Sequence, residues 1–155
     1  MNPNPNGEIF AVVRTFKTLC ATKPFEKGEV IANFRARAIQ AFPSRMTVQL
    51  EANKHILLYP SLLQYVNHSC YPNAFFDTKQ RVLRCVRPIA EGEEIRFFYP
   101  STEWDMEEPF QCNCGEKNCL GLIKGAAHLP PHILQQYELS EYIKGQLEAR
   151  SRASF

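Results

Sequence analysis

Three cysteines lie close together in the stretch CNCGEKNC, residues 112–119 of this 155-residue chain. Cys112, Cys114 and Cys119 have the spacing C-x-C-x4-C. Thiolates so near in sequence pair poorly as disulfides with one another, but they can converge on one tetrahedral cation such as zinc. Gly115, directly after the second cysteine, lets the backbone turn tightly around an ion. The spacing therefore predicts a zinc-binding loop, with redox-active or inert thiols as the alternative.

A closed zinc site needs a fourth ligand, and the chain has three further cysteines. Cys85 lies in the apolar strand pattern RVLRCVR, where a small buried side chain is the simpler interpretation. Cys20 also follows an apolar position. Cys70 lies in the irregular polar stretch NHSCYPN, residues 67–73, which can turn toward a partner loop. On spacing alone, all three stay open as the fourth ligand.

The composition is that of a soluble globular protein, with 45% hydrophobic and 22% charged residues. The net charge is +2 and no run of Lys or Arg occurs, so we expect no direct nucleic-acid partner. No apolar run is long enough to cross a bilayer, and we expect no membrane association. The polar start MNPNPNGEIF lacks the features of a secretory signal. This predicts an intracellular location, in cytoplasm or nucleus, where clustered cysteines are more often metal ligands than disulfides.

Short strands separated by frequent turns predict a mostly β domain of one core, with small helical additions. Residues 1–7 are interpreted as a flexible tail, and Pro60 to Val66 as one or two helical turns. The predicted strands are 9–15, 30–34, 47–50, 56–59, 74–77, 81–87 and 95–99, the last buried on both faces.

From about residue 131, apolar residues recur at helical spacing in two segments, with Ser140 between them as a possible N-cap. We expect a C-terminal helical appendage that packs on its own domain, with dimerisation as the alternative; the oligomeric state stays open. The apolar residues of this pattern are Ile133, Leu134, Tyr137, Tyr142, Ile143 and Leu147.

Three motifs follow one another along the chain: NHSCYPN at 67–73, GEEIRFFY at 92–99 and the cysteine loop. With this order and spacing, residues 8–125 resemble the SET domain and its post-SET zinc loop. That family comprises lysine methyltransferases that use S-adenosylmethionine. The stretch EKGEVI at 26–31 also resembles the family's early turn and strand.

The resemblance implies a SET domain at 8–101, a post-SET zinc loop at 102–125 and a helical extension at 126–155. The SET fold is a β-clip of small curled sheets, in which the segment at 67–73 is threaded beneath a second loop like a pseudoknot. The resemblance also assigns Cys70 as the fourth ligand of a structural zinc site with Cys112, Cys114 and Cys119. Without zinc, we expect this half of the site to be disordered.

The resemblance further implies roles in a reaction with S-adenosylmethionine. Tyr99 matches the tyrosine that faces the transferred methyl group. Asn67 and His68 match residues along the cofactor, where the backbone of His68 is expected to matter more than its ring. Thr18 and Leu19, in the early segment, are expected on the same cofactor.

Aromatic residues near these motifs are expected to form a channel for the amine substrate. Tyr65, Phe97 and Phe98 are the candidates, and such walls would lower the pKa of the amine by desolvation. For one of the two phenylalanines we expect simple core packing instead. Gln64 and Phe98 depart from the arginine and aspartate that are common at their positions in the family.

A larger departure lies near the start of the domain. SET domains normally carry Gly-x-Gly before an early Ala-Thr, because glycine lets the backbone approach the cofactor. Aligning Ala21 and Thr22 with that pair puts Phe16 and Thr18 where the glycines should be, and no glycine occurs from residue 8 to residue 27. We therefore expect a remodelled cofactor pocket.

Three functions stay open. The first is a methyltransferase that acts on a lysine of a protein. The second is a SET-fold enzyme repurposed for small-molecule chemistry such as cyclisation or methylation, and the third is a non-catalytic, zinc-stabilised binding module. Four acidic residues ahead of the zinc loop are expected to be solvated, with attraction of a basic peptide as the alternative. These are Glu103, Asp105, Glu107 and Glu108.

Overall fold

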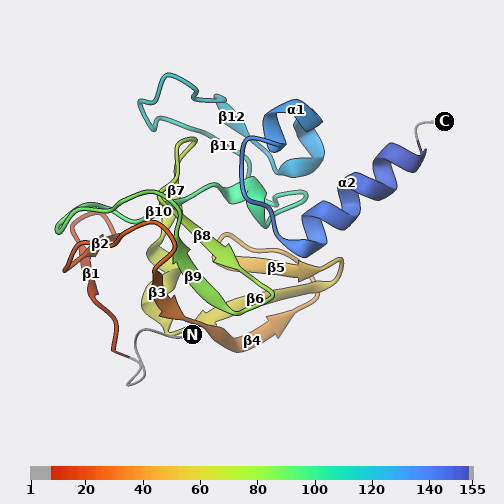
Figure 1. Ribbon diagram of the computed structural model, residues 1–155. Coiled ribbons are helices and arrows are strands. Elements are labelled where there is room, and N and C mark those ends of the chain that lie inside the picture. Colours follow the sequence, from red (N-terminus) through yellow and green to blue (C-terminus); the bar gives the residue numbers. More distant parts are fainter. Residues whose placement is uncertain (1–7, 154–155) are drawn as a thin grey trace.

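The computed structural model describes residues 8–153, so the tail predicted at residues 1–7 lies outside the described part. Its centre is a five-stranded sheet with the strand order β3-β9-β8-β10-β7 (Figure 1). Strand β9 is antiparallel to both β3 and β8, whereas β10 runs parallel to both β8 and β7. The bounds are β3 (Val30–Asn33), β9 (Val82–Cys85), β8 (Ala74–Asp77), β10 (Arg96–Phe97) and β7 (Asn67–His68).

Three smaller sheets surround this one, which confirms the expected mostly β architecture. A three-stranded sheet has the order β4-β6-β5, and two hairpins are β1-β2 and β11-β12. The central core includes the fully buried side chains of Leu19, Ile31, Ile56, Leu63, Leu83 and Ile95. The strand bounds are β4 (Arg35–Gln40), β6 (Lys54–Tyr59), β5 (Thr47–Glu51), β1 (Ala11–Arg14), β2 (Thr18–Ala21), β11 (Phe110–Gln111) and β12 (Leu122–Ile123).

The expected threaded segment is present. Strand β10 comes late in the chain but lies between β7 and β8, so the connection 69–73 has to cross it. Backbone hydrogen bonds from Ser69 N–H to the Phe97 carbonyl (3.0 Å) and from Asn73 N–H to the Arg96 carbonyl (3.1 Å) fix this crossing. The Asn73 side chain adds two more, since its Oδ1 accepts from Arg96 N–H at 2.8 Å and its amide donates to the Glu94 carbonyl at 2.9 Å.

The C-terminal part forms two helices, α1 (Pro131–Leu134) and α2 (Glu141–Ala153), and α2 leads away from the sheets (Figure 1). Ser140 caps α2 as predicted, because its hydroxyl accepts a hydrogen bond from Ile143 N–H at 3.3 Å. Leu134 and Ile143 are fully buried against Phe98 and Ala126. The extension therefore packs on its own domain, in agreement with the predicted appendage.

Some elements differ from the prediction. The strand predicted at 95–99 is limited to β10, because the chain enters a 3₁₀ turn at Tyr99–Ser101. Strands β2 and β4 were not predicted. The helical turns predicted at 60–66 are confirmed as a 3₁₀ turn at Ser61–Tyr65. Within residues 8–153, no helix has the length and apolar character that a membrane span requires.

Candidate functional site

Four cysteine sulfurs meet where the threaded segment touches the hairpin β11-β12. The sulfurs of Cys70, Cys112, Cys114 and Cys119 all lie within 4.8 Å of one another. Four thiolates around one zinc ion, at Zn–S distances of about 2.3 Å, have sulfurs about 3.8 Å apart. The Cys70 and Cys112 sulfurs are 3.9 Å apart, so the arrangement fits a structural zinc site. The positive φ of 77° at Gly115 supplies the expected tight turn.

Burial makes Cys70 and Cys112, the two buried thiols of the cluster, hard to ionise unless a cation is present. Burial raises the pKa of the Cys70 thiol, and burial also raises the pKa of Cys112 to about 11. Four thiolates in so small a volume repel one another unless a cation compensates their charge. Zinc would supply that charge, and these residues offer no open ligand position of their own for catalysis.

The other two cysteines stand apart from the cluster. Cys85 is 1% exposed within the core, as its apolar strand pattern predicted, and Cys20 lies on β2. Cys70 is thus the fourth member of the cluster, as the resemblance implied.

The backbone of Cys70 is held by residues from two later parts of the chain. Its carbonyl accepts hydrogen bonds from the Tyr137 hydroxyl (2.6 Å) and the Asn118 amide (2.8 Å). Its sulfur accepts a hydrogen bond from Leu120 N–H at 3.4 Å. Tyr137 also stacks on Phe98, with ring centroids 3.7 Å apart. The C-terminal extension therefore braces the cysteine cluster.

The imidazole of His68 connects the cysteine cluster to Tyr99. Its Nδ1 accepts a hydrogen bond from Tyr99 N–H at 3.1 Å, which places the proton of the neutral ring on Nε2. Nε2 lies 3.4 Å from the Cys70 sulfur and donates to it. Burial lowers the pKa of His68 to about 4, so the ring is neutral near pH 7. The His68 ring therefore has a structural role of its own, whereas the sequence led us to expect that its backbone matters more.

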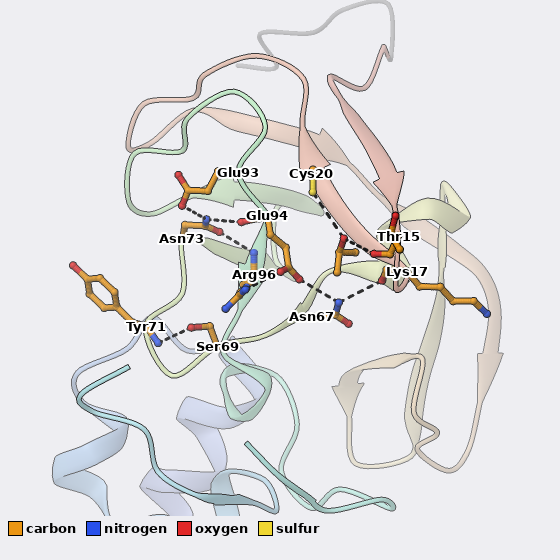
Figure 2. Close-up of polar contacts among 11 residues, drawn as sticks. Thr15, Lys17, Cys20, Asn67, Ser69, Tyr71, Asn73, Glu93, Glu94 and Arg96 are labelled. Atoms are coloured by element: carbon orange, nitrogen blue, oxygen red, sulfur yellow. Dashed lines mark hydrogen bonds and ion pairs between the residues drawn. The ribbon is translucent and has the colours of Figure 1, made fainter. Parts of the chain in front are cut away.

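Asn67 lies in a polar network beside the β1-β2 turn (Figure 2). Its amide donates hydrogen bonds to the Lys17 carbonyl at 3.4 Å and to a Glu94 carboxylate oxygen at 3.2 Å. Glu94 also forms an ion pair with Arg96 at 2.8 Å. The Lys17 side chain points away from this network (Figure 2). The amide group is thus committed to protein partners, while Oδ1 of Asn67 accepts no hydrogen bond from the described residues.

The β1-β2 turn keeps a glycine-like backbone without glycine. Phe16 and Lys17 have φ angles of 63° and 54°, in the left-handed region that favours glycine. Phe16 is 93% exposed, so its side chain gains no burial in return. Of the two positions aligned with the missing glycines, Phe16 therefore adopts the left-handed conformation, whereas Thr18 belongs to strand β2.

A cavity of about 590 Å³ opens between the threaded segment, the loop 43–46 and the loop 106–114. This volume lies within the range of about 300–1,000 Å³ that is usual for small-molecule sites. Its apolar lining is continuous with the core, and carboxylates outnumber the unpaired cations around it. The apolar residues include Val48, Leu58, Leu63, Val66, Phe76 and Phe97. The polar residues include Arg45, Asn67, His68, Glu94, Tyr99 and Glu103.

Tyr99 lies in this cavity among aromatic neighbours. The rings of Phe97, His68 and Phe110 have centroids 4.8, 5.1 and 5.6 Å from that of Tyr99. Burial raises the pKa of Tyr99 to about 12, so its hydroxyl keeps its proton at neutral pH. The cavity thus presents a neutral hydroxyl within an aromatic enclosure.

Several expected site residues lie elsewhere. Phe98 is 1% exposed and stacks on Tyr137, so it packs in the C-terminal cluster and does not form a channel wall. Leu19 is fully buried in the central core, and Thr18 bonds to the Thr15 carbonyl at 3.2 Å. Neither Leu19, Thr18 nor Tyr65 lines the cavity, whereas Asn67, His68, Phe97 and Tyr99 all do.

Sequence reasoning missed several residues of the cavity, among them Glu103 and Phe110. Glu103 was expected to be solvated, but it is 8% exposed and lines the cavity; Asp105, Glu107 and Glu108 are exposed as expected. Phe110 faces Tyr99 from the start of the zinc hairpin. No spacing signal distinguishes Glu103 from its acidic neighbours, because its burial results from contacts with residues far away in sequence.

Comparison with known proteins agrees with this geometry. The family model described as the SET domain matches residues 17–100, and the chain belongs to the SET domain family. It is 46% identical over 142 residues to "Methyltransferase flvH" of Aspergillus flavus, a match that covers 80% of each chain. Over 127 residues it is 33% identical to a histone-lysine N-methyltransferase, H3 lysine-36 specific, of Saccharomyces cerevisiae. That match covers 69% of this chain and 17% of the yeast protein.

Solved structures support the fold. The crystal structure of KRYPTONITE in complex with mCHG DNA and SAH superposes with a TM-score of 0.55 at 17% identity. The match covers 72% of this chain and 28% of that chain. At this identity the likeness shows a shared SET fold.

Proposed function

We propose that this protein transfers a methyl group from S-adenosylmethionine to an amine, with a lysine side chain of a protein as the first candidate substrate. The cavity around Tyr99 carries this proposal. It combines an apolar floor, a neutral tyrosine hydroxyl and an acidic rim, and it lies beside the Asn67–His68 segment of a SET domain. Relatives named as methyltransferases support the reaction class.

The residues present fit a cationic cofactor. The cofactor, when bound, supplies a sulfonium methyl group and also carries an ammonium group. Asn67 Oδ1, the Lys17 carbonyl and the Glu94 carboxylate are acceptors suited to hold such charges. The rings of Phe110 and Tyr99, which both line the cavity, offer aromatic contact for a planar base.

This chain's own contribution to catalysis is to align the amine and keep it dry. Displacement at a methyl carbon needs a short, in-line approach more than it needs covalent help from the protein. Phe97 and Tyr99, with ring centroids 4.8 Å apart, narrow the approach from one side. The Tyr99 hydroxyl, which stays protonated, can hold the amine nitrogen or a developing charge in place. An apolar wall also lowers the pKa of a bound amine and so favours its neutral form.

A small-molecule amine is the second candidate substrate. The chain covers 80% of the Aspergillus methyltransferase, whose name specifies no protein substrate, but 17% of the yeast histone methyltransferase. The glycine-free turn at Phe16 and Lys17 further sets it apart from the family pattern. A non-catalytic binding module and the intracellular location stay predictions.

The deciding experiment is isothermal titration of zinc-loaded protein with S-adenosylmethionine, followed by methyl transfer to a lysine peptide and to free amines. We expect saturable binding and transfer. Tyr99→Phe should lower kcat about 10–100-fold with little change in cofactor affinity. Tyr71→Phe is the matched control, because Tyr71 is 49% exposed and lies outside the cavity. Absence of cofactor binding by the wild-type protein would contradict the proposal and favour the binding module.

A further inference from the structure

Glu103 is a buried acid that the described function does not use. Its backbone is fixed from two sides, since its N–H donates to the Tyr99 carbonyl at 3.0 Å and its carbonyl accepts from Ala126 N–H at 2.9 Å. The residue is 8% exposed and lines the same cavity as Tyr99. Its position is therefore set by the 3₁₀ turn that also carries Tyr99.

The two carboxylate oxygens of Glu103 have different surroundings. Oε2 accepts hydrogen bonds from Thr102 Oγ1 at 2.6 Å and from Gln49 N–H at 3.1 Å. Oε1 receives no hydrogen bond from residues 8–153, although the group lies at the cavity wall. One oxygen thus orients the carboxylate, and the other is left for a ligand.

The charges near the cavity leave Glu103 without a cationic partner. Arg96 is paired with Glu94 at 2.8 Å, and Arg45 is exposed at the loop 43–46. Glu107 and Glu108, which also line the cavity, add further negative charge. Within the described part of the chain, Glu103 takes part in no salt bridge. Burial raises the pKa of Glu103 to about 7, the range in which a carboxyl exchanges protons at physiological pH.

We propose that Glu103 receives the ammonium group of the substrate and takes its proton before methyl transfer. The proton moves from nitrogen to Oε1, so an N–H bond breaks, an O–H bond forms, and the electron pair stays on nitrogen. With a cofactor bound, its sulfonium methyl group would be the electrophile for this neutral amine, and the thioether would be the leaving group. The carboxyl proton leaves to solvent through the cavity mouth. This inference rests on the proposed function and defines its substrate as a cationic amine.

The acidity of Glu103 makes this transfer feasible. A lysine amine has a pKa of about 10.4 and an ordinary glutamate about 4.3, a gap that costs about a factor of 10⁶ in the transfer equilibrium. A carboxyl with a pKa of about 7 reduces that factor to about 10³. Desolvation of the ammonium by Phe97 and Val66 reduces it further.

The first test is the pH profile of kcat/KM for zinc-loaded wild-type protein and the Glu103→Gln variant. The wild type should show a rising limb near pH 7, where Glu103 becomes a carboxylate. In the Glu103→Gln variant that limb should vanish, and kcat/KM at pH 8 should be about 100-fold lower than in the wild type. Its kcat/KM should instead rise about tenfold per pH unit up to the pKa of the free amine, because only the neutral amine then reacts. Glu91→Gln is the matched control, because this exposed carboxylate lies outside the cavity, and its profile should be unchanged.

A second variant keeps the charge. Thr102→Val removes the 2.6 Å hydrogen bond to the carboxylate, which raises the pKa of Glu103 further and should move the limb to higher pH. If Glu103→Gln keeps the wild-type limb while cofactor binds and methyl is transferred, this inference is wrong and the proposed function stands. A wild-type protein that neither binds cofactor nor transfers methyl contradicts the proposed function itself.

Binding of n-butylamine tests the site without methyl transfer. By calorimetry at pH 6, in buffers of different ionisation enthalpy, binding to the wild type should release a proton, and at pH 8 it should release none. At pH 8 Glu103→Gln should bind it at least about tenfold more weakly, while n-butanol should bind both proteins alike. Equal affinity of the wild type for n-butylamine and n-butanol would overturn the inference.

Discussion

Phe16 and Lys17 adopt a backbone conformation that their side chains disfavour. Each has a positive φ, and such a conformation costs a residue with a Cβ about 1 kcal/mol. The carbonyl of Lys17 accepts a hydrogen bond from the Asn67 amide, which ties the turn to the threaded segment. The strained turn therefore contacts the Asn67 end of the candidate site, and local strain is often retained at functional sites.

Replacing Phe16 by glycine should stabilise the protein. Phe16→Gly removes the left-handed strain and loses no packing, because the side chain is 93% exposed. We expect a gain of about 0.5–1 kcal/mol in the free energy of unfolding, after allowing for the greater freedom of glycine in the unfolded chain. Urea unfolding measures this. Phe42→Gly is the control, because Phe42 is 77% exposed without a positive φ, and it should not stabilise. A loss of stability in Phe16→Gly would contradict the strain argument.

Individual site residues were predictable where a motif fixed them. The cysteine spacing and the SET resemblance identified all four members of the cluster, and the structure brings them together. The sequence left open which of Phe97 and Phe98 packs in the core, and it did not predict the burial of Glu103, for one reason. Whether Phe98 faces the cavity or Tyr137, and whether Glu103 is solvated or buried beside Gln49, depends on contacts across the whole chain.

At the level of elements, strands β3, β8, β9 and β10 of the central sheet were predicted because they lie in apolar segments bounded by turns, whereas the polar β7 was not. Strand β4 (RARAIQ) was not, since its exposed, charged and alanine-containing sequence has a low strand propensity. It forms by pairing with β6 along five residue pairs. Strands β7, β10, β11 and β12 have two residues each, and such short strands exist only through their tertiary partners.

Two glycines, one at the end of the zinc loop and one in the C-terminal extension, should respond to alanine in opposite ways. At Gly125, with φ of 117°, a Cβ would lie 2.5 Å from the Trp104 carbonyl oxygen, so Gly125→Ala should cost about 2–4 kcal/mol. At Gly145, inside α2, a Cβ meets nothing within 4 Å, so Gly145→Ala should gain about 0.5–1 kcal/mol. Thermal unfolding of both variants measures these changes. Equal effects of the two substitutions would show that the contact with Trp104 does not constrain the extension.

Across the whole molecule, three parts of the chain meet at Cys70. The threaded segment supplies the residue, hairpin β11-β12 surrounds its sulfur, and the extension binds its carbonyl through Tyr137. The His68 ring contacts both the Cys70 sulfur and the Tyr99 N–H, so it connects this junction to Tyr99. The Tyr99 carbonyl in turn accepts a hydrogen bond from Glu103 N–H at 3.0 Å. Zinc at the cluster would therefore organise one wall of the cavity as well as the loop that binds it.

Removal of zinc should loosen this junction and leave the sheets folded. Chelation, or Cys119→Ser, should lower the melting temperature by about 10 °C or more, because the buried sulfurs lose the cation that compensates them. Hydrogen exchange should show lost protection at residues 106–125 and in α2, while β8 and β9 stay protected. Cys20→Ser is the matched control, since Cys20 lies outside the cluster on β2. Loss of protection throughout the chain would mean that zinc supports the whole fold. Unchanged protection would mean that the cluster needs no metal.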